Sequence, residues 1–212
     1  MRRTRYPFSI AFALVLSAVL AFPAYAGPPL LCHVFDTGGA KSLPWVSQSW
    51  NLDGQEKYDL RNLVPDTLAI LAPGAPILVR METLRRASLY SRRDTHLAKE
   101  LLVKLVARAT AAESSGRPDA LALFDAGYLA ETYKQLHGDK EENPARGFDG
   151  YGWVKKALQL RGEDPQMEFA AALITSFRPS RGDSRQHFQK ASAGAKSDAL
   201  LARNLASFGH GN

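Results

Sequence analysis

From residue 56 onward, apolar residues recur at the spacing of amphipathic helices, and no stretch after residue 50 alternates apolar and polar residues as a strand would. The clearest helix follows Asp94 or Thr95, either of which suits a capping position, and its apolar positions are Leu97, Leu101, Leu102, Leu105, Val106 and Ala109. The spacing predicts helices over residues 78–92, 95–116, 118–137, 151–161, 165–177, 184–193 and 198–208. Pro118 suits the first position of its helix. The chain is therefore expected to be all-α.

The first 26 residues have the pattern of a secretory signal peptide. Residues 2–5 contain three arginines, residues 10–22 are apolar, and residues 24–26 form a small-x-small cleavage site. Removing this leader lowers the formal net charge from +6 to +3, which gives no reason to expect nucleic acid as a partner. No later stretch approaches the roughly 20 apolar residues of a membrane helix. We expect an exported protein, periplasmic or secreted, without a transmembrane helix in the mature chain.

Residues 27–55 differ from the rest in being rich in Gly, Pro and Ser, with aromatic and aliphatic residues interspersed. We expect an irregular segment that packs on the helices. Its opening, Gly27-Pro-Pro-Leu-x-Cys32 followed by Ala40-Lys-Ser-Leu-Pro-Trp45, resembles uncharacterised exported bacterial proteins, which supplies no function. The expected organisation is a signal peptide (1–26), this irregular segment (27–55) and a helical domain (56–212).

Residues 150–208 repeat at a spacing of 34 residues. Trp153-Val-Lys-Lys-Ala157 falls on His187-Phe-Gln-Lys-Ala191, and Gly150 falls on Ser184. The junction from Ala157 to Pro165 resembles the turn between successive tetratricopeptide-type (TPR-like) repeats, with Gly162 where that family usually has proline. The resemblance implies antiparallel helix pairs in a right-handed array, acting as a non-enzymatic binding scaffold.

Such an array would bind an envelope protein or peptide on the concave side of its helices. The candidate binding residues, chosen by side-chain type, are Arg85, Arg92, Tyr128, Tyr133 and Trp153. Arg85 and Arg92 stand seven apart on one side of their helix, so they form either a basic binding stripe or a solvated face. In the same helix Glu82 precedes Arg86 by four residues, the order that favours an ion pair.

The alternative hypothesis is a small exported enzyme or redox protein centred on Cys32, His33 and Asp36. Cys32 is the only cysteine, so it serves in an intermolecular disulfide, as a ligand, or as a small buried residue. Cys32 and His33 supply the thiol and imidazole of a possible thiol site. The stretch from Phe35 to Gly38 resembles the aspartic-protease loop, which requires a second carboxylate. The other histidines show no metal-ligand spacing, so neither a metal nor a cofactor is expected.

Overall fold

The computed structural model describes residues 27–46, 52, 54–177 and 182–209. Within these residues every regular element is a helix, which confirms the all-α prediction. The elements are α2 (Pro29–Cys32), the 3-10 turn η1 (Leu60–Asn62), α3 (Leu63–Ile70), α4 (Ile77–Tyr90), α5 (Thr95–Ser114), α6 (Ala120–His137), α7 (Gly150–Arg161), α8 (Pro165–Ser176), α9 (Gly182–Gly194) and α10 (Ala199–Gly209). None of the described helices is long and apolar enough to cross a membrane. The predicted signal peptide lies outside the described residues.

Aspartates define where most of these helices begin. Five carboxylates accept hydrogen bonds from first-turn amides, namely those of Asp94, Asp119, Asp149, Asp164 and Asp198. The α6 prediction needs correction at its start, because the helix begins at Ala120 behind the Asp119 cap and Pro118 precedes it. Gly138 and Gly162 follow α6 and α7 with φ of 61° and 74°, a backbone conformation in which glycine avoids the strain of a Cβ.

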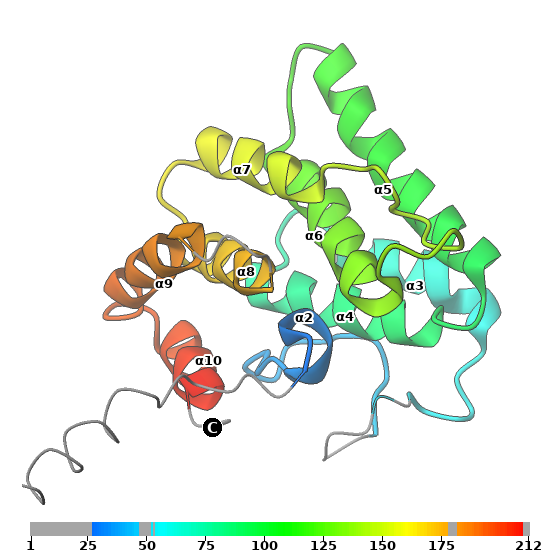
Figure 1. Ribbon diagram of the computed structural model, residues 1–212, viewed down its shortest axis with the longest axis horizontal. Helices are drawn as coiled ribbons and strands as arrows, with labels where there is room; N and C mark the ends of the chain where they lie inside the picture. The colour runs from blue at the N-terminus through cyan, green and yellow to red at the C-terminus, as the bar shows by residue number, and fades with distance from the viewer. Residues whose placement is uncertain (1–26, 47–51, 53, 178–181, 210–212) are drawn as a thin grey trace, which may run out of the picture.

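Alternate helices begin at one common edge of the molecule. The Leu78 amide of α4 donates to Gln166 Oε1 of α8 at 3.2 Å, and Gln166 Nε2 donates to the Asp198 carboxylate before α10 at 2.6 Å. A cavity of about 360 Å³ at this edge is lined by residues from the starts of α4, α6 and α8, including Leu121. We call α4, α6, α8 and α10 the inner layer, because they share this edge while α5, α7 and α9 carry the chain back to it (Figure 1).

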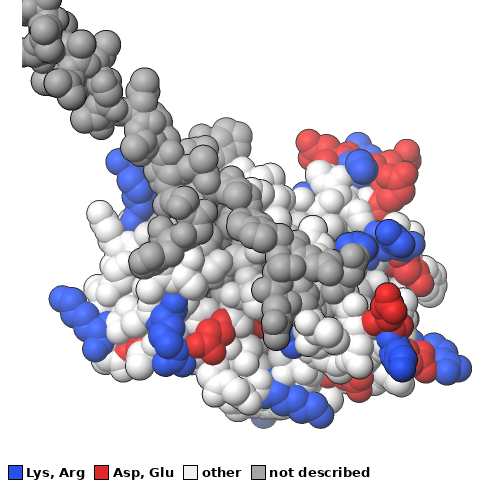
Figure 2. All heavy atoms as spheres, turned by 90° about the horizontal axis from the view of Figure 1, so that it is seen from below, with Lys and Arg blue, Asp and Glu red and all other residues white. Residues whose placement is uncertain are grey.

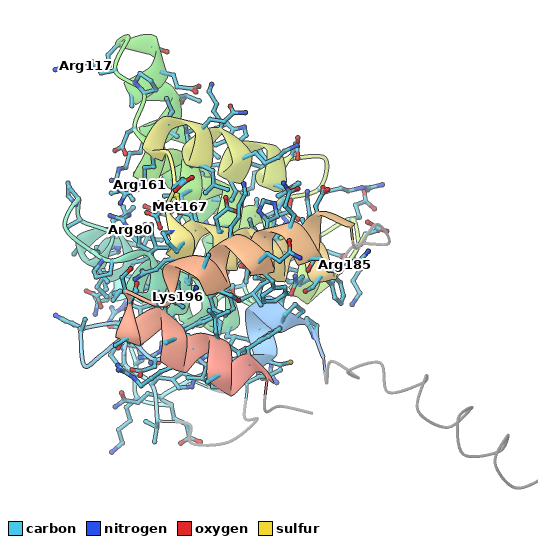
Figure 3. The ribbon with its side chains drawn as sticks, turned by 90° about the vertical axis from the view of Figure 1, so that its left-hand side faces the viewer. Arg80, Arg117, Arg161, Met167, Arg185 and Lys196 are labelled. Carbon is cyan, nitrogen blue, oxygen red and sulfur yellow. The ribbon has the colours of Figure 1, made fainter. Side chains whose placement is uncertain are left out.

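Small residues allow consecutive helices to approach closely. A Cβ added at Gly150 of α7 would lie 2.5 Å from the Gly127 carbonyl oxygen of α6, so only glycine fits there. Between α8 and α9, the buried Ser184 hydroxyl donates to the Ala172 carbonyl at 3.1 Å. Viewed from the side, α7, α9 and α10 lie one below another, with Arg185 and Lys196 near opposite ends of α9 (Figure 3).

Candidate functional site

Residues 29–46, called the N-terminal loop from here on, lie across the inner layer. The Leu30 amide donates to Gln135 Oε1 of α6 at 2.9 Å, and the Phe35 ring meets the Phe169 ring of α8 edge-on at 6.1 Å. Asp36 exchanges two hydrogen bonds with the Asn204 side chain of α10, at 2.9 and 3.0 Å. Helix α2, at the start of this loop, lies against α4, α6 and α8 (Figure 1). The loop therefore touches every helix of the inner layer.

Asp36 organises the turn at which the loop reverses. Its carboxylate accepts from the Gly38 amide at 2.8 Å, and Gly38 and Gly39 take φ of 65° and 83°. The other carboxylate oxygen lies 2.8 Å from Arg203 Nε, and this hydrogen bond lowers the pKa of Asp36. Asp36 therefore has a structural role as the cap of a glycine turn.

After this turn, the loop returns along α4 and is held mainly by its backbone. The Ser42 and Thr83 hydroxyls lie 3.0 Å apart. Arg86 of α4 donates to the Leu43 carbonyl, and the Tyr90 hydroxyl of α4 donates to the Pro44 carbonyl. These contacts run in chain order along the helix, so the second arm of the loop lies parallel to α4.

A buried charge cluster on α4 holds both arms of the loop. Glu82 has no exposed surface and accepts from Arg85 at 2.8 and 2.9 Å and from Arg86 at 2.6 Å, as its spacing from Arg86 predicted. Glu82 also accepts from the Phe35 amide at 3.1 Å, and Arg85 donates to the Leu31 carbonyl at 3.0 Å. This cluster therefore bonds to main-chain atoms of the loop from its α4 side.

Three of the predicted binding residues are interior residues, which corrects the expectation that they form an accessible surface. Arg85 is 1% exposed because the loop covers it, and its guanidinium lies over the Trp45 ring at 5.1 Å. Tyr128 and Tyr133 are fully buried in α6, and burial raises the pKa of both. The spacing of Arg85 gave no sign of its burial, because that burial depends on a segment distant in sequence.

The other two predicted residues are partly accessible but lie apart from each other. Arg92 donates to the Leu52 carbonyl at 3.0 Å beyond the end of α4. Trp153 of α7 packs against Phe148, with ring centroids 4.8 Å apart. The five candidates therefore do not form one surface. On the face seen in Figure 2, lysines and arginines are interspersed with acidic residues.

The environment of the predicted thiol site does not favour an activated nucleophile. Cys32 is half-buried, and burial raises the pKa of its thiol more than the nearby Arg85 lowers it. Burial lowers the pKa of His33 to about 4, so its imidazole is neutral at pH 7. The His33 ring lies edge-on to Phe35 and Phe208, at 5.1 and 5.2 Å. Among the described residues no hydrogen bond joins the thiol to the imidazole.

A second polar cluster, which the sequence reasoning missed, joins α7, α8 and α9. The Tyr151 hydroxyl lies 2.8 Å from His187 Nε2, and His187 Nδ1 contacts the Glu168 carboxylate. Lys190 donates to the other oxygen of Glu168 at 3.1 Å. Nothing in the spacing of these residues indicates the cluster, because they come from three helices. A cavity of about 340 Å³ beside it is lined by Glu168 and Lys190 but not by Tyr151 or His187.

Neither metal-site geometry nor similarity assigns a function. The described part of the chain contains no group of three or more His, Cys, Asp or Glu residues placed to hold a metal ion. No protein-family model, no curated protein and no solved structure matches the chain.

Proposed function

We propose that the protein is an exported, non-enzymatic scaffold that binds a protein or peptide of the cell envelope through its inner layer. The observation that carries this proposal is that four helices jointly hold one stretch of chain, the helical turn α2 and the irregular residues after it, whose hydrogen bonds to these helices are made mostly by main-chain atoms. Gln135, Glu82 and Asn204, on three of these helices, each bond to a backbone amide of the N-terminal loop. A face built in this way suits short peptide segments in general.

We further propose that the helices form a TPR-like right-handed array of antiparallel pairs, α6 with α7 and α8 with α9. The close-approach residues Gly150 and Ser184 support this, because they stand 34 positions apart and each lies where its helix meets the preceding one. The common edge of the inner layer is also what such an array would produce. Export to the periplasm or outside rests on the signal-peptide pattern.

The alternative, an enzyme or redox protein using Cys32, His33 and Asp36, has less support. Asp36 is engaged with Arg203 and Gly38, and burial disfavours both the thiolate of Cys32 and the imidazolium of His33. An intermolecular disulfide through Cys32 stays open, because the thiol is only half-buried.

Affinity purification from the native envelope tests the scaffold against this alternative. The mature protein and its Cys32→Ser variant are used side by side under non-reducing conditions, and co-eluting proteins are identified. We expect the same specific partner with both forms. A partner lost with Cys32→Ser would transfer the function to the thiol, and no partner with either form would overturn the scaffold.

A further inference from the structure

We infer that the N-terminal loop is an intramolecular occupant of the binding face, and that a short segment of a partner protein takes the place of its first arm. The first arm comprises residues 30–36. This inference rests on the proposed function and adds to it the chemistry of the partner and the way in which binding is controlled.

The contact between the loop and α4 is built so that it can separate. Glu82, Arg85 and Arg86 satisfy one another within a single helix, at spacings of three and four residues. When the first arm leaves, this cluster stays paired and regains water, which offsets part of the cost of exposing apolar surface. The loop also keeps one side in water, since Val34 is 46% exposed. An interface that combines buried polar contacts with a solvated outer side resembles separable interfaces between proteins.

The buried side chains of the first arm define the chemistry of the partner. Leu30, Leu31 and Phe35 are at most 3% exposed, whereas Val34 and Asp36 between and beyond them face solvent. The Phe35 side chain is buried against the Phe169 ring. The displacing segment should therefore begin with a helical turn that presents one or two leucine-sized residues, as α2 does, and carry an aromatic residue four positions after the second. A charge at the aromatic position would be buried without a partner.

Because the second arm stays bound to α4, the first arm competes with the partner segment for the same site. The second arm remains on α4 through Arg86 and Tyr90, so the released first arm stays close to its site. An external segment therefore competes with a high effective concentration of the arm. Weakening the docking of the arm should strengthen binding of the external segment.

The probe for this inference is a fluorescently labelled peptide of residues 27–46, in which Cys32→Ser prevents oxidation. It is titrated against the full mature chain and followed by fluorescence anisotropy. We expect saturable binding, and binding about tenfold tighter to the Asp36→Ala protein, whose own arm has lost the turn hydrogen bond and the Arg203 ion pair. A peptide carrying Phe35→Asp should bind at least about tenfold more weakly.

An engineered disulfide that holds the first arm on α10, and that reduction releases, supplies the matched control. The Asp36 main chain exchanges two hydrogen bonds with the Asn204 side chain, so the pair Asp36→Cys and Asn204→Cys, in a Cys32→Ser background, is tested for disulfide formation. Thiol titration reports whether the bridge has formed. The oxidised protein should not bind the peptide, and the same protein after reduction should.

The outcomes separate this inference from the proposed function. An absence of saturable peptide binding to both the wild-type and the Asp36→Ala proteins, or equal binding to the locked and reduced proteins, would overturn the inference. If the disulfide-locked protein still captured an envelope partner, the scaffold function would be supported and the displacement of the first arm would be contradicted. Concentration-dependent oligomers that disappear on locking would show that the arm exchanges between copies, which would overturn its assignment to a separate partner.

Discussion

Asp125 and Arg80 form an ion pair without solvent exposure between α6 and α4. Arg80 Nη1 lies 2.6 Å from the Asp125 carboxylate, and its other nitrogens donate to the carbonyls of Ala72 and Ala75. Burial is the largest influence on Asp125 and raises its pKa to about 7, although Arg80 opposes this shift. The second carboxylate oxygen of Asp125 finds no hydrogen-bond partner among the residues that the structure describes. This pair therefore fixes the turn before α4 at a high electrostatic cost.

Replacing Asp125 by Asn should change how stability depends on pH. The folded-state pKa lies above the unfolded value, so the contribution of Asp125 is fully present below about pH 4 and is lost as pH rises toward 7. The loss is at most about 1.4 kcal/mol per pH unit. Urea unfolding at pH 4.5, 6 and 8 should show wild type losing stability relative to Asp125→Asn as pH rises. A constant difference between the two proteins would contradict this.

The titration of His33 should change stability with pH in the direction opposite to that of Asp125. Its pKa is lowered to about 4, so the unfolded chain takes up a proton below about pH 6.5 while the folded protein does not. Stability is therefore lost as pH falls from 6.5 toward 4, by up to about 2 to 3 kcal/mol at pH 4.5. The His33→Phe variant should lose less stability than wild type between pH 7.5 and 4.5. His96→Phe, at an exposed position in α5, is the control and should behave like wild type.

At the scale of elements, helix contacts depend on a few small residues whose role is backbone approach. Gly150 is the clearest, because the opposing atom is the carbonyl oxygen of Gly127 and not a flexible side chain. Ser184 occupies the corresponding contact between α9 and α8 and keeps its hydroxyl paired. The cluster of Tyr151, His187 and Glu168 then fixes the relative positions of α7, α8 and α9.

Gly150→Ala should separate α6 from α7 and destabilise the protein by about 1 to 3 kcal/mol, the usual cost of overpacking. Thermal and urea unfolding measure the loss. Gln159→Ala, at an exposed position of the same helix, controls for the change in composition and should cost little. If Gly150→Ala were as stable as this control, the close contact would not be a constraint on the fold.

At the scale of the whole molecule, the inner layer and the N-terminal loop should differ in how readily they open. The Phe35 and Asp36 amides bond to side chains of α4 and α10, whereas the amides within α6 belong to a buried helix. Local opening costs less where few backbone bonds are broken. Hydrogen exchange should therefore give these two amides opening free energies at least about 2 kcal/mol below those of α6. Equal values would mean that the loop opens only when the protein unfolds, which would argue against its displacement.

The sequence by itself determined most of the helices, because helix formation depends on neighbours within one or two turns. Asp94 and Pro165 mark helix starts, the Glu82 and Arg86 spacing indicates their ion pair, and the 3.6-residue period excludes strands. Only the tertiary structure decided which side chains are accessible. Arg85 lies in a helix that could have faced solvent, and it is buried because a segment some fifty residues earlier in the chain lies over it. Contacts between residues so far apart leave no local pattern, so composition indicated that the N-terminal segment packs on the helices but spacing could not predict its position on the inner layer.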